Sequence, residues 1–315
     1  MKRLLVESPG FFTTVQDLGR PGFGPIGVSP SGAADSVSLR IGNLLLNNPP
    51  GAAALEMTLA GGVYSFPDGA GLALAGADFG ASLDGAAVAP WQVIHAAPGQ
   101  TLRLGGTHTG ARCYLCVAGG FVVSSFLGSA STHVLSGVGG FKGRSLKRGD
   151  MLEIGDAASS PGRSRIRPDV LAQLQPSKLL RMTKGPQSDW FDENARAIFY
   201  SAKYSVTEEA NRMGLRLQGP AVPLAKNRTM LTEGAPLGAV QVPESGQPII
   251  LFVEQQTTGG YPKIANVITA DMNSVGQLRP RDEVQFELVT FEVARNLLRE
   301  QERLLSSSEL IEVSE

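Results

Sequence analysis

The stretch Leu146-Lys147-Arg148-Gly149-Asp150-Met151-Leu152-Glu153-Ile154 has a counterpart in Leu278-Arg279-Pro280-Arg281-Asp282-Glu283-Val284-Gln285-Phe286. A basic residue, an aspartate and alternating apolar positions fall at matching places in both. Upstream, residues 34–41 correspond to residues 210–217. Each of these segments is followed by a glutamate, Glu56 in the first half and Glu233 in the second. Matched segments in the same order indicate an internal duplication. We therefore expect two related β-rich lobes, each ending in one copy of the first stretch.

The composition favours two domains made of short strands. A chain of 315 residues exceeds what one hydrophobic core usually holds. It is 42% hydrophobic and 18% charged, with 38 glycines and 20 prolines, and this abundance of turn formers predicts many strands and few helices. The formal net charge of -1 shows no bias towards nucleic acid or an anionic membrane, so neither is expected as a partner.

Short apolar segments alternate with turn signals along the first half, a pattern typical of a barrel or sandwich. One helix is expected after Ser29-Pro30-Ser31-Gly32, with Ser31 as its N-cap, and Asn47-Asn48-Pro49-Pro50 ends it. An amphipathic helix is expected beyond Glu287, with a frayed tail from Ser306. The strands are expected at 71–77, 81–87, 91–96, 100–104, 112–117 and 151–154.

A polar, basic segment rich in breakers, Asp156–Pro168, is the best candidate for a linker. The expected fold is therefore mainly β, with two related lobes and a few helices. Its expected boundaries are a first lobe over 1–160, a linker over 161–176, a second lobe over 177–290, and a helix and tail over 291–315.

Cys113 and Cys116 lie inside a segment that has the pattern of a buried strand, whose geometry sends them to opposite faces. Without further cysteines or a nearby histidine they make no zinc site, and buried packing in a reducing compartment is expected. The histidines, His95, His108 and His133, show no metal-ligand spacing, so no metal site is expected. The N-terminus does not have the pattern of a signal peptide and no stretch is long enough to span a membrane, which predicts a cytoplasmic protein.

The run Thr257-Thr258-Gly259-Gly260-Tyr261-Pro262 lies between two apolar segments, Ile249–Val253 and Ile264–Ile268. Glycines leave backbone N–H groups uncovered, and the hydroxyls of Thr257, Thr258 and Tyr261 add directional hydrogen bonds. This combination suits an oxygen-rich ligand or a carbonyl that develops negative charge. A plain hairpin turn punctuated by glycine and proline explains the same residues.

A polar stretch near the N-terminus includes Gln16, Asp17 and Arg20, and Ser31 follows closely at the expected start of a helix. A helix N-terminus favours anions, and Arg20 is able to hold a carboxylate through a bidentate pair. A structural turn between Asp17 and Arg20 is the alternative explanation.

Another polar set follows in the second half, with Asn211 and Arg212, then Glu233, then the run from Glu254 to Thr258. Amides such as Gln256 beside hydroxyls are able to match the donors and acceptors of an amide-containing ligand, although a solvated strand end explains them equally well. Lys263 and Asp271 are further candidates for charge, which a surface ion pair would also explain.

Several sequence motifs of cofactor sites are absent. The chain has no Walker A sequence, no strand-bound G-x-G-x-x-G, no G-x-S-x-G elbow and no lysine-bearing biotin attachment motif. If ATP or biotin takes part, another chain must bring it.

Four segments together carry a family resemblance. They are Thr14–Gly22, Gly27–Asp35, Asn211–Leu217 and Gln256–Pro262. In this order they resemble the family that includes the C subunit of 5-oxoprolinase, KipA and the second subunit of allophanate hydrolase, and the resemblance covers nearly the whole chain. One departure is Glu254-Gln255, where similar proteins tend to carry Asp with Arg or His.

The resemblance implies two related lobes with a cyclophilin-like β-barrel fold, and partner subunits. Similar proteins work with a KipI-like B subunit, and in 5-oxoprolinase with an A subunit as well, to open the lactam of 5-oxo-L-proline to L-glutamate at the expense of ATP. The related region of urea carboxylase instead transfers a carboxyl group from carboxybiotin. A third implied role is that of a KipA-like antagonist of a kinase inhibitor.

These implications lead to a hypothesis about the site. Arg20 or Arg212 pairs with the substrate carboxylate, with Gln16, Ser31, Asn211 and Gln256 as further binding residues. The loop from Thr257 to Gly260, including Thr258 and Gly259, donates hydrogen bonds to the lactam or carbamoyl oxygen, and Tyr261 is a further catalytic candidate. Asp17 and Glu233 are assigned to orientation or proton transfer.

Overall fold

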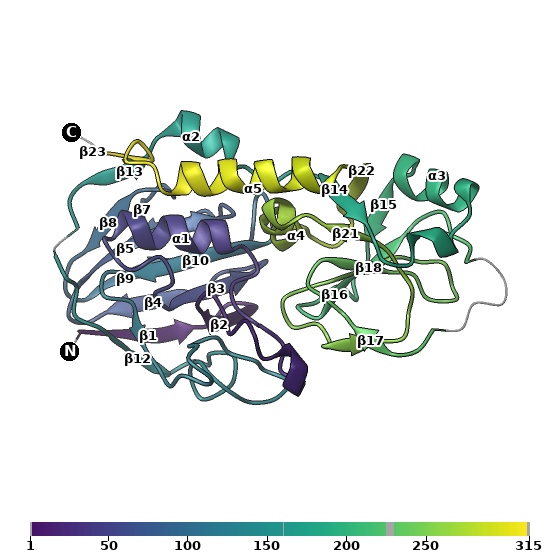
Figure 1. Cartoon of the computed structure of the whole chain (residues 1–315). Helices are drawn as coiled ribbons and strands as arrows, with labels where there is room; N and C mark the ends of the chain where they lie inside the picture. Colours follow the sequence, from purple (N-terminus) through teal and green to yellow (C-terminus); the bar gives the residue numbers. More distant parts are fainter. Residues whose placement is uncertain (1, 160, 225–229, 314–315) are drawn as a thin grey trace. The chain divides into compact units, whose positions relative to one another are not determined.

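The computed structural model describes residues 2–159, 161–224 and 230–313. The chain divides into two compact units, and each is assembled from separate parts of the sequence (Figure 1). Unit 1 comprises Met1–Arg20, Ser31–Gln175 and Leu304–Glu315, and unit 2 comprises Pro21–Pro30 and Pro176–Arg303.

Unit 1 is built on two antiparallel sheets. Seven strands follow the order β11-β12-β1-β4-β9-β6-β7, and five follow the order β2-β3-β10-β5-β8. Alternate side chains of both sheets, such as Leu4, Tyr64, Leu72 and Leu115, meet in one buried core. The strands are β1 (Lys2–Ser8), β2 (Phe12–Gln16), β3 (Ala54–Thr58), β4 (Val63–Phe66), β5 (Ala70–Gly76), β6 (Ser82–Leu83), β7 (Ala86–Ala87), β8 (Val93–Ala96), β9 (Gln100–Arg103), β10 (Arg112–Val117), β11 (Phe121–Val122) and β12 (Met151–Ile154).

The central strand β10 is buried along its whole length because both faces of the five-stranded sheet are covered. Cys113 faces the core between the sheets, whereas Cys116 faces a second apolar cluster that includes residues of α1 (Ser36–Leu45). The expected opposite placement of the two cysteines is confirmed, and both are free and buried. Burial raises the pKa of both thiols well above the ordinary value.

The N-cap of helix α1 lies further along the chain than expected. The Asp35 side chain caps the helix by accepting from the backbone N–H of Ser38 at 2.9 Å. The prediction of Ser31 as the N-cap is therefore wrong. Ser31 has a positive φ of 55° and donates its hydroxyl to the Thr132 carbonyl at 3.3 Å.

A methyl group at position 42 should destabilise unit 1. Gly42 of α1 packs on β10 so closely that an added Cβ would lie 2.7 Å from Cys116 Sγ. We expect Gly42→Ala to lower the free energy of unfolding by about 1–3 kcal/mol, because overpacking outweighs the better helix propensity of alanine. Urea denaturation would measure the change, and an unchanged or increased stability would contradict the packing argument.

Unit 2 holds a closed barrel in the order β14-β21-β18-β19-β16-β15-β22. The pairing of β14 with β22 is parallel, and the other pairs are antiparallel. Phe199 of α3 packs against Phe286 of β22 with ring centroids 4.7 Å apart. The elements are β14 (Leu179–Lys184), η2 (Ser188–Trp190), α3 (Glu193–Ser201), β15 (Tyr204–Val206), β16 (Gly214–Gln218), β17 (Glu233–Gly234), β18 (Ala239–Gln241), β19 (Ile249–Leu251), β20 (Thr258–Gly259), β21 (Lys263–Val267), η3 (Thr269–Asp271), α4 (Met272–Gln277) and β22 (Glu283–Leu288), with η1 (Gly24–Ile26) from the N-terminal part.

The mainly β fold with few helices is confirmed. Within the described residues a closed barrel forms in unit 2, whereas the strands of unit 1 form separate open sheets. The lobes are therefore less alike than a simple duplication suggests.

The repeated stretch nevertheless makes the same turn in both units. The Asp150 carboxylate accepts from the backbone N–H of Lys147 at 2.7 Å, and the Asp282 carboxylate accepts from that of Arg279 at 2.9 Å. The residue before each aspartate has a positive φ, 85° at Gly149 and 72° at Arg281.

Each turn is also tied to a strand in the same way. Val6 exchanges two backbone hydrogen bonds with Gly149 and Asp150, and Val206 exchanges two with Arg281 and Asp282, all at 2.7–2.9 Å. The expected correspondence of the two stretches thus holds in three dimensions. The upstream correspondence does not, because residues 34–41 enter α1 whereas residues 210–217 enter β16.

The segment expected as a linker, 161–176, is ordered and belongs to unit 1 apart from Pro176. It forms β13 (Ser164–Ile166) and α2 (Pro168–Gln173), whose Ile166 and Val170 are buried. The expected C-terminal helix is present as α5 (Phe291–Leu305). The described part of the tail, which ends at Val313, is not frayed, since β23 (Ile311–Val313) pairs with β13.

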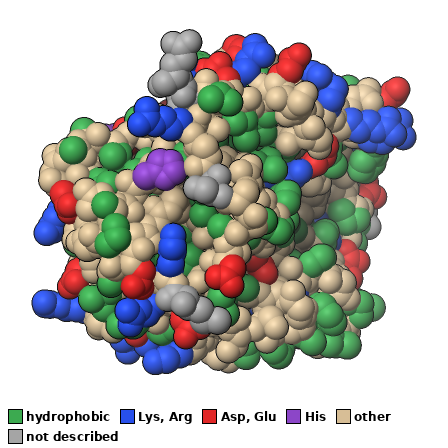
Figure 2. Space-filling view, turned by 90° about the vertical axis from the view of Figure 1, so that its left-hand side faces the viewer, with side chains coloured by type: hydrophobic (Ala, Val, Ile, Leu, Met, Phe, Trp, Pro, Cys, Tyr) green, Lys and Arg blue, Asp and Glu red, His purple; other side chains and the backbone are tan. Residues whose placement is uncertain are grey.

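The surface carries both signs of charge. On the face drawn in Figure 2, acidic and basic side chains are interspersed and neither forms a continuous field. Among the described residues, the helices all fall short of the length and apolar character needed to cross a membrane.

Candidate functional site

A short ribbon in unit 2 brings together two segments that the sequence places far apart. Strand β20 pairs with β17, so that Glu233 lies opposite Gly259 and Gly234 lies opposite Thr258. The backbone N–H of Ala235 extends the ribbon by donating to the Thr257 carbonyl at 2.9 Å. Part of the glycine-rich run is thus a strand, and it meets the glutamate that was predicted for the same site.

A buried lysine lies beside this ribbon. Lys263, the first residue of β21, is 1% exposed, and its Nζ lies 2.6 Å from Glu233 Oε1. The Gln187 Nε2 donates to the same Glu233 oxygen at 2.8 Å, and the Gln187 Oε1 accepts from the backbone N–H of Lys263 at 3.1 Å. Lys263 therefore does not form an ion pair at the surface, which was one of its two possible explanations. Its partner Glu233 is less buried, with 44% of its side chain exposed.

Two glutamines complete this group. Gln241 of β18 is the Cα partner of Lys263 in the barrel and is 1% exposed. The Gln256 Nε2 donates to the Gln241 Oε1 at 3.3 Å. We give the name ribbon site to the two paired strands β17 and β20 together with Gln187, Gln241, Gln256 and Lys263.

The ribbon site should stabilise unit 2 in a pH-dependent way. Hydrogen bonding by Lys263 and then by Gln187 lowers the pKa of Glu233 below its ordinary value. A lowered carboxyl pKa gives stability that is complete above the unfolded-state pKa and is lost as the pH falls through the folded-state pKa. We expect the difference in unfolding free energy between the wild type and Glu233→Gln to shrink as the pH is lowered through this range. Denaturant unfolding from about pH 7 to about pH 3 would measure it, and a constant difference would contradict the assignment.

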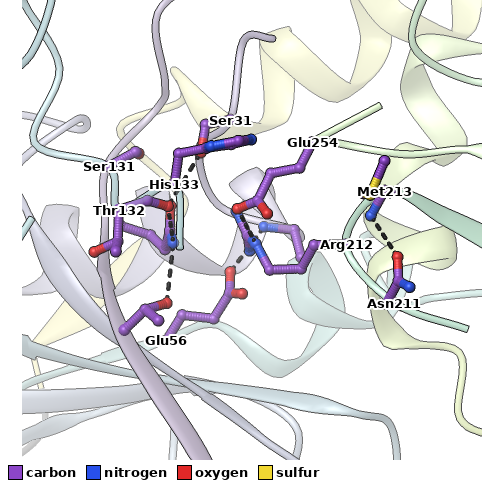
Figure 3. Close-up of polar contacts among 12 residues, drawn as sticks. Ser31, Glu56, Ser131, Thr132, His133, Asn211, Arg212, Met213 and Glu254 are labelled. Carbon is purple, nitrogen blue, oxygen red and sulfur yellow. Dashed lines mark hydrogen bonds and ion pairs between the residues drawn. The ribbon is translucent and has the colours of Figure 1, made fainter. Parts of the chain in front are cut away.

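The predicted residues Asn211 and Arg212 lie on another loop of unit 2. Arg212 is 7% exposed, and its Nε lies 2.6 Å from Glu254 Oε1, so that the family departure at Glu254 supplies its counter-ion (Figure 3). Asn211 is exposed and turns the loop, since its Oδ1 accepts from the backbone N–H of Met213 at 2.8 Å. Both residues thus have a structural function within unit 2.

Asp17 organises a loop of unit 1. Its carboxylate accepts from the Gly19 and Ala130 backbone N–H groups at 2.7 and 2.6 Å, and from the Ser129 and Ser131 hydroxyls at 2.6 and 2.5 Å. Four donors on one carboxylate are the signature of a structural anchor, which favours the structural alternative for this residue.

The other predicted residues of unit 1 are buried around the same loop. Arg20 is 2% exposed, donates to the backbone carbonyls of Phe126 and Ser131, and lies 5.5 Å from the centre of the Phe126 ring. Gln16 is fully buried, and its Nε2 donates to Thr14 Oγ1 and to the Thr132 carbonyl at 2.9 and 3.1 Å. Ser31 contacts the same Thr132 carbonyl (Figure 3).

Glu56, the first-half counterpart of Glu233, is buried in unit 1. One of its oxygens accepts from the Ala34 backbone N–H at 2.8 Å and from the Tyr114 hydroxyl at 2.7 Å. Burial, followed by the Glu56 charge, raises the pKa of Tyr114 well above its ordinary value. The two glutamates of the proposed repeat therefore occupy dissimilar surroundings.

The structure therefore groups part of the predicted site and separates the rest. Glu233, Thr257, Thr258, Gly259 and Gln256 come together in unit 2, and Tyr261, 46% exposed, follows the ribbon in the chain after Gly260. Gln187 and Gln241 were not predicted, because each stands in an ordinary loop or strand context with no local signal.

Within the described ranges, no group of three or more histidine, cysteine, aspartate or glutamate side chains is arranged to hold a metal ion. The ribbon site instead offers an ammonium, carboxamides, a hydroxyl and a carboxylate. Such a set suits hydrogen bonding to an amide or carboxyl group.

The sequence matches a known protein family and several named proteins. The carboxyltransferase domain family, subdomains A and B, matches residues 26–288. The chain is 40% identical over 300 residues to the C subunit of 5-oxoprolinase from Escherichia coli (strain K12), and the match covers 95% of this chain and 96% of that protein. It is 36% identical to the protein of the same name from Haemophilus influenzae, with 92% of each covered.

Fungal proteins contain a related region. The urea amidolyase of Saccharomyces cerevisiae is 32% identical over 96% of this chain, which spans 17% of that protein. The crystal structure of Kluyveromyces lactis urea carboxylase superposes with a TM-score of 0.91 at 31% identity, over 99% of this chain and 30% of the other. By its length of match and its fold, the chain belongs to the carboxyltransferase domain family, subdomains A and B.

Proposed function

We propose that this chain is the C subunit of an ATP-dependent 5-oxoprolinase, which converts 5-oxo-L-proline to L-glutamate. The observation that carries the proposal is the 40% identity to a 5-oxoprolinase C subunit over nearly the full length of both proteins. The ribbon site supports it, because a lactam presents a carbonyl oxygen to hydrogen-bond donors.

We assign the ribbon site to the lactam. The Thr257–Gly260 backbone, the Thr258 hydroxyl and the Lys263 ammonium are donors that would stabilise the negative charge on the lactam oxygen when water adds to the carbonyl carbon. That charge is lost again as the C–N bond breaks and the ring nitrogen leaves as the amine of glutamate. Glu233, held by Lys263 and Gln187, would orient the lysine or exchange a proton with the opening ring. Tyr261 stands at the exposed end of the same run.

The substrate carboxylate is assigned less directly. Arg20 and Arg212 already donate to groups of this chain, Arg20 to two backbone carbonyls and Arg212 to Glu254. The assignment of the lactam therefore depends on the ribbon site alone. It stays a prediction that either arginine pairs with the substrate carboxylate, and that further contacts come from Asp17, Gln16, Ser31 and Asn211.

ATP would be bound elsewhere in the complex. The sequence holds no Walker A motif or Gly-rich loop opening a helix, so no step at the ribbon site is assigned to the nucleotide. We propose a KipI-like B subunit and an A subunit as the partners that supply the nucleotide site.

Reconstitution tests the proposal. The chain would be co-purified with B-type and A-type subunits from the same organism, and glutamate release from 5-oxoproline would be measured with ATP while each protein is omitted in turn. We expect activity that disappears when this chain is left out. An intact complex without activity would overturn the proposal.

A second candidate function is carboxyl transfer from a biotinylated partner. The superposition on a urea carboxylase over 99% of this chain favours it. Carboxylation of a urea-like amide that requires an added biotin carrier, in the absence of glutamate release, would replace the first proposal by this one.

A further inference from the structure

The barrel of unit 2 buries a hydrogen-bond donor that has no acceptor. Gln241 is 1% exposed, and its Nε2 has no hydrogen-bond partner anywhere in the described part of the chain. Buried polar groups are almost always paired, so an orphaned amide next to a polar cluster indicates a missing ligand atom or water.

The surroundings set the orientation of this amide. The Gln256 Nε2 donates to the Gln241 Oε1 at 3.3 Å, which leaves the Gln241 Nε2 turned towards the ribbon. There it lies against Gly259, where an added Cβ would stand only 2.5 Å from the Gln241 Nε2. Gly259 therefore provides the space that this donor occupies. A plain turn would not explain why a glycine is needed at this position.

A second buried donor lies alongside. Gln241 and Lys263 are Cα partners on β18 and β21, and the Lys263 Nζ is buried as well. Glu233 offsets the lysine charge at 2.6 Å, and its lowered pKa keeps it ionised at neutral pH. The donor pair is thus close to electrically neutral, which favours a neutral carbonyl oxygen over a free anion.

We propose that Gln241 and Lys263 form a two-donor seat for the carbonyl oxygen of a neutral amide, with Gln256 as the positioning residue of Gln241. The naming of that amide as the lactam of 5-oxoproline rests on the proposed function, whereas the seat itself rests on the contacts above. The ribbon of β17 and β20, which borders the seat at Gly259, is only two residue pairs long.

A direct binding measurement tests the seat without any activity. The full chain labelled with ¹⁵N would be titrated with 2-pyrrolidinone, and the Gln241 side-chain resonances would be assigned from their loss in Gln241→Leu. We expect these resonances to shift with 2-pyrrolidinone and to stay in place with tetrahydrofuran, a ring of the same size without a carbonyl. Resonances that do not move with 2-pyrrolidinone would show that water alone satisfies the amide, and would overturn the proposal.

Kinetics in the reconstituted complex give a second test. Gln241→Leu should lower kcat/KM for 5-oxoproline about a hundredfold, and Gln256→Leu should lower it by less, since it acts through Gln241. Gly259→Ala should resemble Gln241→Leu because its methyl group displaces the donor, whereas Gly106→Ala, whose methyl group meets open space in unit 1, should not. Gln285→Leu on an exposed position of β22 is the matched control for the glutamine variants.

The two proposals fail separately. A wild-type complex that releases no glutamate would contradict the proposed function, while a carbonyl-dependent shift of Gln241 would still support the seat. An active complex in which Gln241→Leu and Gln285→Leu behave alike would contradict the seat alone.

Discussion

Replacing Lys263 by methionine is expected to lower glutamate release by the reconstituted complex about a thousandfold in kcat. Methionine keeps the length of the side chain but removes the ammonium that stands beside the ribbon, and it leaves Glu233 without its charge partner at 2.6 Å. A buried donor aimed at a developing oxyanion contributes mainly to the transition state, so kcat should fall more than KM rises. Steady-state kinetics at saturating ATP would measure the effect.

The matched control is Lys203→Met, because Lys203 is an exposed lysine of unit 2 that pairs with Glu283 at the surface. It should retain full activity, since exposed ion pairs contribute little. Gel filtration and thermal unfolding would establish that the Lys263 variant still folds and assembles. A well-assembled Lys263→Met complex with unchanged kcat would remove Lys263 from the reaction.

The second large effect is one of stability. Asp17→Ala should lower the free energy of unfolding by about 4 kcal/mol, because two backbone N–H groups and two serine hydroxyls lose their common acceptor. Urea denaturation of the full chain would measure the loss.

A less buried aspartate provides the comparison. Asp78 accepts from the Gly80 backbone N–H at 2.8 Å in an exposed turn, and Asp78→Ala should cost less than about 1 kcal/mol. If Asp17→Ala kept its stability but abolished activity in the complex, the anchor interpretation would be wrong and the catalytic assignment of Asp17 would gain support.

Local patterns were enough to predict much of the strand content. The bounds expected for β10 and β12 agree with the structure to the residue, because apolar runs there are flanked by clear turn signals. The repeated stretch was informative for the same reason, since its aspartate turn is formed by residues three apart in the chain.

Long-range register was not accessible from the sequence. Gln241 gains its importance from pairing with Lys263 across the barrel, and Gln187 from contacts with Lys263 and Glu233 some 46 or more positions away. The sequence does not place the N-cap of α1, because Ser31 and Asp35 both have suitable side chains and only the path of the backbone selects Asp35. The segment 161–176 has a composition typical of linkers, yet burial of Ile166 and Val170 orders it.

The division of the chain has an evolutionary consequence. Each compact unit includes a short segment that is distant in sequence from the rest of that unit, because residues of the other unit lie between them. These segments are Pro21–Pro30 in unit 2 and Leu304–Glu315 in unit 1. A cut at any single point would leave one lobe without part of its own sequence, so genes encoding this architecture should be shuffled and fused only as one cassette. The fungal proteins fit this rule, since a single chain many times longer carries the counterpart of both lobes together.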